Sequence, residues 1–476
     1  MRGIEEKRSF MLVKDKGFYK TIFLVSLPAA LQSLISFLVV IADNVMVSFV
    51  EDGVNAQAAV SQVNSITTFY TATILGVVGG SAVLISQYWG KNDIIQIKKI
   101  FSVVMRFSLG VALVFVALGI ICPRAIVSLM VGKDSTAVTE YAVTYFRIVC
   151  FSWLPYAICY TLVGMLRCVE VVKVALYTSV VALVVDVGLN YILSFGKLGF
   201  PAMGVAGIAV GTLVSRIVEL IIVLVFTFCI QKKIPVKLKD FFKTEKVLVK
   251  DYVRYGVPVL LTDMQWALVG LLKVAIIGHV SAVFMAANSI ANSMIDLSTL
   301  FAFSLANGAC VVVGKAVGRG DYTLARQYSN TIQLMFLAIG ILMCAAVLIF
   351  NRAFVSLYGT ADDPEVRQMS ITFINIVAIS LIGTSYHASC FKGINRGSGD
   401  SRFVALVDMI CGWGVVIPLM LLTTFVFHSP LPVIFFCTRI DQCFKWIFAL
   451  VRLRGNKWIK NVTRKTGTEG LPDTTG

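Results

Sequence analysis

The chain has 476 residues, of which 58% are hydrophobic and 14% are charged, and its mean hydropathy is +0.84. Soluble globular proteins carry about 25% charged residues, so the composition excludes that class and indicates an integral membrane protein. The net charge of +16 does not require a nucleic-acid partner, because the basic residues gather in loops on one side of the predicted membrane, where they also attract anionic lipid.

Apolar stretches recur along nearly the whole chain, each of about 20 residues, the length that a helix needs to cross a hydrocarbon core of about 30 Å. The pattern predicts an all-α integral membrane protein with twelve transmembrane helices. The predicted spans are 21–46, 57–86, 100–121, 141–166, 174–195, 204–230, 254–280, 283–313, 330–350, 369–391, 403–427 and 431–451. The first is expected to be retained, because the polar stretch before it and the lack of a small-residue cleavage site do not match a signal peptide.

Lysine and arginine are distributed unequally between the two sides of the predicted membrane. With the N-terminus inside, one side receives the basic leader, the linker, the tail and the loops near Lys91, Arg167, Lys315 and Arg396. The other side receives few basic residues and most of the acidic loop residues. The positive-inside rule therefore predicts a multi-pass plasma-membrane protein with both termini in the cytoplasm.

The sequence contains an internal repeat. GGSAVLISQYWGKND (79–93) aligns without gaps on NGACVVVGKAVGRGD (307–321), and the offset of 228 also matches VSL at 127–129 and 355–357. Two homologous six-helix lobes follow, which a pseudo-twofold axis along the membrane normal is expected to relate, because six crossings return each half to the same side. The predicted divisions are a cytoplasmic leader 1–20, an N-lobe 21–230, a basic cytoplasmic linker 231–253, a C-lobe 254–451 and a basic cytoplasmic tail 452–476.

Two glycines occupy matching positions in this repeat. Gly90 and Gly318 follow long apolar runs in the two copies. Because glycine accepts the left-handed conformation in which many helices end, we expect these residues to stop the second and eighth helices.

Several motifs point together to one family. They are LPAALQS and IADNVMVS in the first predicted helix, ISQYWGKND after the second, LNYILSFGKLGFPAMGVAG from the fifth to the sixth, GHVSAVFMAANSI around the seventh and eighth, and INRGSGDSRF after the tenth. In this order the chain resembles bacterial multidrug and toxic compound extrusion (MATE) transporters over about residues 20–460. The resemblance implies a secondary antiporter that exports organic cations or amphiphilic drugs in exchange for H⁺ or Na⁺ by alternating access between two lobes. It implies a monomer in contact with membrane lipid and a small-molecule substrate, with no cofactor beyond the coupling ion.

Four polar residues of the N-lobe are candidates for ion coupling. Asp43 matches the first-helix aspartate of the family, and a free carboxylate within a bilayer costs at least about 2.5 kcal/mol; the alternative is a solvated helix end or a surface ion pair. Asp186 and Asn190 lie four residues apart and share one helix face, either as a proton or cation site with Asp43 or as a structural hydrogen bond. The family pattern L-D-x-x-x-x-F-G has an aspartate where this chain has Asn190. Asn64 is a further candidate ligand or a packing residue.

The C-lobe has a different set of intramembrane polar residues. Asp263, Lys273, Asp296 and Asp408 fall within predicted helices, and Lys273 takes roughly the repeat position of Asp43. They could form a neutralised network, since burying either charge unpaired is unfavourable, couple ions, or contact substrate. Arg216 and Glu219 of the N-lobe are expected to form a local ion pair.

Two other classes of function remain open at this stage. One is a flippase of lipid-linked oligosaccharide or cell-wall precursor in the same superfamily, to which Lys273 and Arg147 would be suited. The other is a membrane-embedded enzyme, which the scattered histidines and the lack of acidic metal-binding clusters disfavour. The 11 cysteines have no paired spacing, so we expect buried thiols, and no metal site beyond Na⁺ at the ion-coupling residues.

Overall fold

The computed structural model describes residues 12–50, 52–128, 136–237, 240, 245–358 and 363–464. Over these ranges the chain is helical, with no strand, as predicted. The helices are α1 (Lys16–Ser48), α2 (Gly53–Gly90), α3 (Ile94–Ile121), α4 (Pro123–Ser128), α5 (Thr136–Val149), α6 (Trp153–Cys168), α7 (Lys173–Ser194), α8 (Val205–Val225), α9 (Lys246–Tyr255), α10 (Val257–Gly278), α11 (Ala282–Arg319), α12 (Tyr322–Val355), α13 (Pro364–Ala388), α14 (Ser401–Met409), α15 (Ile417–Leu421) and α16 (Leu431–Arg454). A 3-10 turn, Cys150–Ser152, joins α5 to α6, and π-helical segments occur at Phe226–Ile230, Ser389–Asn395, Ile410–Val416 and Leu422–Val426.

All twelve predicted spans coincide with helices of the structure. Within the described ranges, eleven helical segments are long and apolar enough to cross a membrane. The remaining predicted span is α16, whose apolar stretch is interrupted by Arg439, Asp441 and Lys445. The twelve-helix prediction is confirmed, and α16 differs from the other spans because it carries charge into the C-lobe interior.

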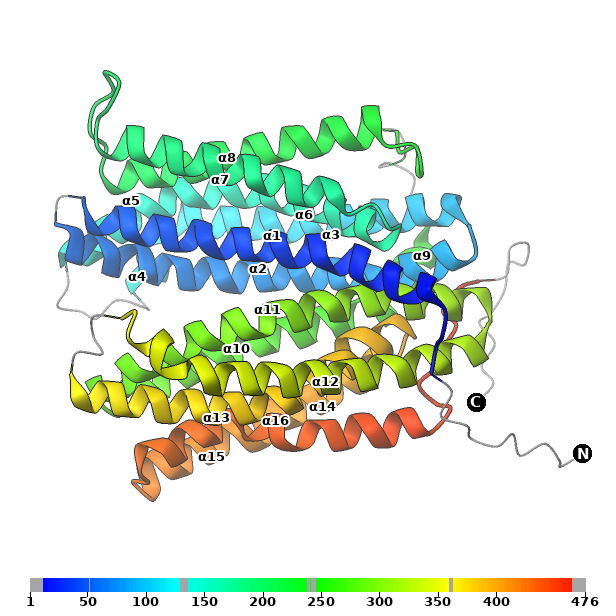
Figure 1. Ribbon diagram of the computed structural model, residues 1–476. Coiled ribbons are helices and arrows are strands. Elements are labelled where there is room, and N and C mark those ends of the chain that lie inside the picture. The colour runs from blue at the N-terminus through cyan, green and yellow to red at the C-terminus, as the bar shows by residue number, and fades with distance from the viewer. Residues whose placement is uncertain are drawn as a thin grey trace, which may run out of the picture.

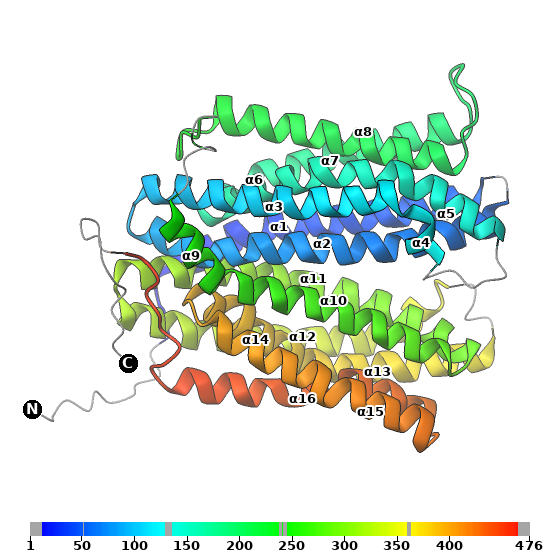
Figure 2. The same cartoon turned by 180° about the vertical axis from the view of Figure 1, so that it is seen from behind.

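The helices form two lobes that lie side by side. In Figure 1, α1 to α8 make up one lobe and α10 to α16 the other. Figure 2 shows α9 between α3 and α10, and α9 contacts helices of both lobes. The lobes meet where α2 packs on α10 and α11, and where α11 packs on α1. The start of α1 and the end of α16 lie at the same end of the molecule (Figure 1), which we call the terminal face.

Each lobe has its own apolar core, and apolar side chains also cover the outside. The N-lobe core lies among α2, α3, α5, α6 and α8, and the C-lobe core among α10, α11, α12, α13 and α16. On the outer side of α12, Leu342 is 69% exposed and Ile349 is 73% exposed. Helices that are apolar on their outer faces as well as in the core fit a lipid environment.

The two lobes touch through a reciprocal pair of glycine contacts near the terminal face. A Cβ atom at Gly90 of α2 would lie 2.2 Å from the carbonyl oxygen of Lys315 in α11. A Cβ atom at Gly318 of α11 would lie 2.0 Å from the carbonyl oxygen of Gln87 in α2. The repeat offset of 228 relates Gly90 to Gly318 and Gln87 to Lys315. Each contact is therefore the repeat equivalent of the other, as a twofold relation requires.

This packing corrects the expectation that Gly90 and Gly318 end their helices in a left-handed conformation. At these two helix ends the positive φ values belong to Asn92, at 58°, and Gly320, at 82°, which also occupy matching repeat positions. Gly90 is the last residue of α2 and Gly318 the last but one of α11, so the helices do end there as expected, but neither glycine has a positive φ. They are glycines because the two helix backbones approach too closely there for a side chain.

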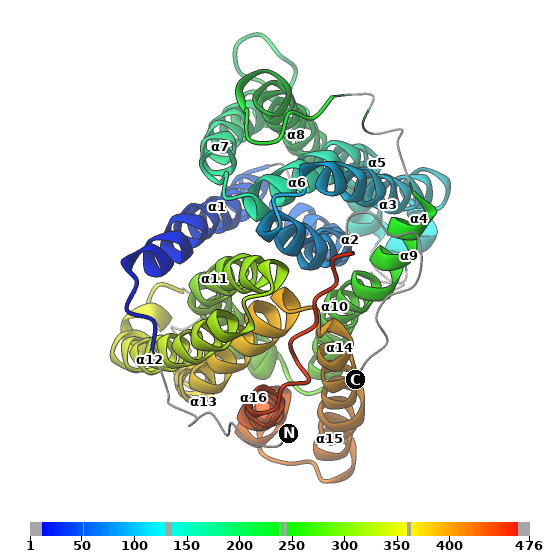
Figure 3. The same cartoon turned by 90° about the vertical axis from the view of Figure 1, so that its right-hand side faces the viewer.

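The segment after α16 crosses the terminal face from the C-lobe to the N-lobe. Figure 3 shows it running from α16 to α2. Gln87 of α2 donates from Nε2 to the carbonyl oxygens of Gly397 and Lys460, both at 3.1 Å, and its Oε1 accepts from the backbone N–H of Val462 at 2.8 Å. Asn461 donates from Nδ2 to the carbonyl oxygen of Val317 at 3.1 Å, and Arg464 donates to both carboxylate oxygens of Asp251 at 2.8 Å. Lys315 forms an ion pair with Glu170. This face of the lobe interface is therefore closed. Residues 1–11 of the predicted leader, parts of the linker and residues 465–476 of the tail lie outside the described ranges.

Candidate functional site

Three candidate residues of the N-lobe meet in its interior. Asn190 of α7 donates from Nδ2 to Asp43 Oδ1 of α1 at 2.7 Å, and to Asp186 Oδ2 one turn earlier at 3.2 Å. The side-chain spacing of i and i+4 puts Asp186 and Asn190 on the α7 face that packs on α1. Asp43 is 7% exposed, Asp186 is 1% exposed and Asn190 is fully buried. One amide thus joins two buried carboxyl groups from different helices.

Helix α8 completes this site. Ser215 donates from its hydroxyl group to Asp186 Oδ1 at 2.9 Å. Asn190 Oδ1 is buried without a hydrogen-bond partner among the described residues. A Cβ atom at Gly211 would lie only 1.9 Å from this oxygen, so glycine at this position allows α8 to pack closely against the amide.

The charge around the site is negative. Arg216 forms the predicted ion pair with Glu219, at 2.8 Å, and its guanidinium lies 5.5 Å from the centre of the Tyr156 ring. Asn190 joins Asp43 and Asp186, and no ion pair connects either carboxyl group to Arg216 among the described residues. Two ionised carboxyl groups in one buried site repel each other more strongly than they would in water, so a proton or a small hard cation held among these oxygens would relieve the repulsion.

Asn64, the fourth N-lobe candidate, is not joined to this arrangement by a described hydrogen bond. It is half-buried on α2. In the part of the chain that the structure describes, no group of three His, Cys, Asp or Glu residues has the arrangement of a metal site.

Of the four C-lobe candidates, Asp263 is buried, Lys273 and Asp408 are half-buried and Asp296 is exposed, and each interacts mainly with residues outside the predicted set. Asp263 of α10 pairs with Arg396, with Nη2 at 3.2 Å from Oδ1 and 3.3 Å from Oδ2. Both side chains are almost fully buried. Lys273 donates to the carbonyl oxygen of Thr438 at 2.7 Å, so it is not directly bonded to any of the three predicted aspartates among the described residues.

Helix α16 supplies the remaining partners. Lys445 is bonded to Asp408 at 2.9 Å and to Asp441 at 2.8 Å. Arg439 donates to the Ser380 hydroxyl group at 3.2 and 3.1 Å and also interacts with Asp296 through its charge. The sequence analysis did not select these α16 residues, although the signal was present as three charges in the last apolar run.

Aromatic residues near the N-lobe interior fall into two groups. Tyr70 and Trp153 are buried and stack on each other, with ring centres 4.8 Å apart, which indicates packing. Tyr156 and Tyr160 stack at 5.5 Å and are only half-buried. In the C-lobe, Trp266 is 61% exposed.

Comparison with known proteins gives consistent results. The MatE family model matches residues 28–192 and 258–422, one match in each lobe. The chain is 24% identical to the uncharacterized transporter YisQ of Bacillus subtilis, over 94% of this chain and 96% of that protein. It is 23% identical to the probable multidrug resistance protein YoeA of the same organism, over 77% and 78% of the two chains. A mutant of the Vibrio cholerae MATE transporter VcmN has a similar structure, with a TM-score of 0.82, 15% identity and coverage of 93% of this chain and 99% of that one.

Proposed function

The chain belongs to the MatE family of multidrug transporters, and we propose that it is a secondary antiporter that exports organic cations or amphiphilic compounds in exchange for H⁺ or Na⁺. The observation that carries the proposal is the buried bridge in which Asn190 joins Asp43 and Asp186. The substrate class and the exchange for an ion are both part of the proposal, because the family match by itself supports only a multi-pass transporter of small molecules.

The geometry of the bridge supports a site that alternates between two occupants. Its carboxyl oxygens and the unpartnered Asn190 Oδ1 suit a proton or Na⁺, because hard cations prefer oxygen ligands. An organic cation in the same lobe would be attracted by the same negative charge. Binding of the coupling ion neutralises that charge and weakens the attraction for the substrate, which is the basis of exchange.

The lobe interface supports alternating access. If the terminal face is cytoplasmic, as the positive-inside rule predicts, the close contacts at Gly90 and Gly318 would be those of a state closed to the cytoplasm. Rocking one lobe against the other would then have to separate α2 from α11. On this proposal the protein lies in the plasma membrane with both termini inside, works as a monomer and needs no cofactor.

The test is transport of ethidium in vesicles that contain the purified full-length protein, under proton and sodium gradients imposed separately. We expect the wild type to respond to at least one gradient, and Asp43→Asn and Asp186→Asn each to lower coupled transport by at least about tenfold, the effect of about 1.4 kcal/mol. Each substitution keeps the side-chain size and removes one negative charge from the bridge.

Asp52→Asn is the matched control, because Asp52 is an exposed residue bonded to Asn55 at the start of α2. It should transport like the wild type. Unchanged coupled transport in both bridge variants would remove the site assignment. Wild-type protein that moves no cation under either gradient would contradict the antiporter proposal and favour the flippase.

A further inference from the structure

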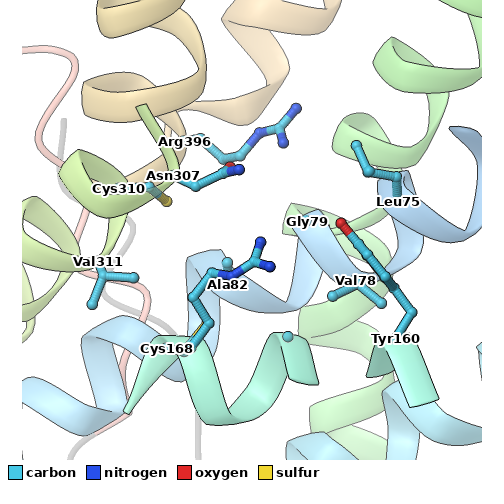
Figure 4. Close-up of a pocket in the computed structure, with 12 residues that line it drawn as sticks. Leu75, Val78, Gly79, Ala82, Tyr160, Cys168, Asn307, Cys310, Val311 and Arg396 are labelled. Atoms are coloured by element: carbon cyan, nitrogen blue, oxygen red, sulfur yellow. The ribbon is translucent and has the colours of Figure 1, made fainter. Parts of the chain in front are cut away.

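A cavity lies between the two lobes. It is small, with a volume of about 50 Å³, and it is lined by α2 and α6 of the N-lobe and by α11 and Arg396 of the C-lobe. Figure 4 shows Arg396 and Asn307 on one side of it and Tyr160 on another. The Asp43 and Asp186 bridge is not part of its lining, so this is a separate site.

Two arginines that occupy matching positions of the repeat, within one residue of the offset of 228, line this cavity. Arg167 lies in the last turn of α6, in the fourth span, and Arg396 follows the π-helical segment Ser389–Asn395 of the tenth span. The cavity receives one guanidinium group from each lobe. None of the described residues that line it is acidic.

Only one of these arginines has a carboxylate partner among the described residues. Arg396 uses Nη2 for its ion pair with Asp263. Its Nη1 is directed to α2, where it lies 2.8 Å from the position of a Cβ atom at Gly79. Arg167 donates from Nη2 to the neutral Gln32 amide oxygen at 3.2 Å, and its Nε is buried without a partner. The cavity therefore carries a net positive charge with unused N–H groups.

We propose that this cavity binds an oxyanion, of the phosphate or phosphonate type, either free or as the head of an amphiphile. Arginine presents a planar fork of donors that matches the oxygens of such groups, and the Asn307 amide and Tyr160 hydroxyl group add donors. The apolar side chains of Leu75 and Val78 also line the cavity and offer a surface for a short alkyl chain. This binding site extends the ligand range of the protein beyond cations.

The binding experiment uses the purified full-length protein in a non-ionic detergent at constant ionic strength. Inorganic phosphate and octyl phosphate are titrated, and the midpoint of thermal unfolding is followed, because a ligand that binds only the folded state raises it. 1-Octanol, which has the same alkyl chain and no charge, shows the effect of the alkyl chain alone. A response to inorganic phosphate identifies a free anion as sufficient, and a response only to octyl phosphate identifies an amphiphile.

The variant Arg167→Gln tests the site without disturbing the ion pair between Arg396 and Asp263. We expect it to weaken binding of the responding phosphate probe by at least about tenfold, because hydrogen bonds to charged groups are among the strongest in proteins. Arg167→Lys keeps the positive charge and should retain part of the affinity for the phosphate probe. It also shows whether the protein tolerates replacement of this arginine. Arg147→Gln is the control, since Arg147 is an exposed arginine of the same lobe, and it should change the affinity by less than about twofold.

Two results would overturn the proposal. One is the absence of any midpoint shift in the wild type with either phosphate probe. The other is equal affinity for the phosphate probe in the wild type and in a folded Arg167→Gln protein. Either result leaves the cation antiport proposal intact, because Arg167 is not part of the Asp43 bridge.

Discussion

Removing the side chain of Gln87 should open the terminal face. In the Gln87→Ala variant the side-chain bonds to Gly397, Lys460 and Val462 are lost. These bonds connect α2 of the N-lobe to the C-lobe and to the segment that follows α16. No bond within the N-lobe core is removed, so the variant should alter the relation between the lobes more than the stability of either lobe.

The expected magnitude follows from these three hydrogen bonds. Each contributes about 1 kcal/mol net, so the closed state should lose about 3 kcal/mol. Because 1.4 kcal/mol is a factor of ten, the equilibrium between open and closed terminal faces should shift by about 100-fold. Water can solvate the freed backbone groups when the face opens, which makes this value an upper bound.

Two native cysteines provide the assay. Cys168 is 3% exposed and Cys310 is 2% exposed, and both line the cavity between the lobes. We expect N-ethylmaleimide to modify them at least about tenfold faster in Gln87→Ala than in the wild type, as measured by mass spectrometry of the peptides. The exposed Cys122 serves as an internal standard whose rate should not change.

Gln333→Ala is the matched control for this prediction. Gln333 is a half-buried glutamine whose side-chain bonds reach only Ser329 and Tyr386 within the C-lobe. It should leave the rates at Cys168 and Cys310 unchanged. Equal labelling of the cavity thiols in the wild type and in Gln87→Ala would refute the reasoning that these bonds hold the face closed.

Two further substitutions test the interior of each lobe. Gly211→Ala places a methyl group 1.9 Å from Asn190 Oδ1, so the amide must leave the bridge. We therefore expect gradient-driven ethidium transport by the folded variant to be at least about tenfold slower than by the wild type. Transport at the wild-type rate would argue against the bridge. Lys445→Met leaves Asp408 and Asp441 without the ammonium group that pairs with both. We expect a loss of about 3–5 kcal/mol of stability, measured as a lower thermal unfolding midpoint, and an unchanged midpoint would show that the pairing does not stabilise the lobe.

The candidate site was predictable from the sequence in part. The shared helix face of Asp186 and Asn190 follows from their spacing, because every α-helix puts i and i+4 side chains together. The contact with Asp43, which is 147 residues from Asn190 in the sequence, was predicted only from the family resemblance. The bond from Ser215 and the close approach of Gly211 depend on how α8 packs, which no local pattern indicates.

The glycines of the repeat show the same limit. The matching of Gly90 with Gly318 was visible in the sequence, and the helices do end there, but the left-handed conformation that was expected to require glycine is absent. A glycine that ends a helix and one that admits a neighbouring backbone look alike in sequence. Only the position of Lys315 and Gln87 on the facing helices separates the two explanations.

The sequence by itself determined the membrane class, the twelve spans and the two-lobed repeat. These properties depend on the length of apolar runs and on internal similarity, both of which are local or additive along the chain. Only the tertiary structure decided that Asp263 pairs with Arg396 and that Lys445 forms ion pairs with two carboxylates of the C-lobe. It also decided that Arg167 lines a cavity without a described carboxylate partner. Pairing of buried charges depends on the depth and rotation of packed helices, which are set by contacts between residues far apart in the chain.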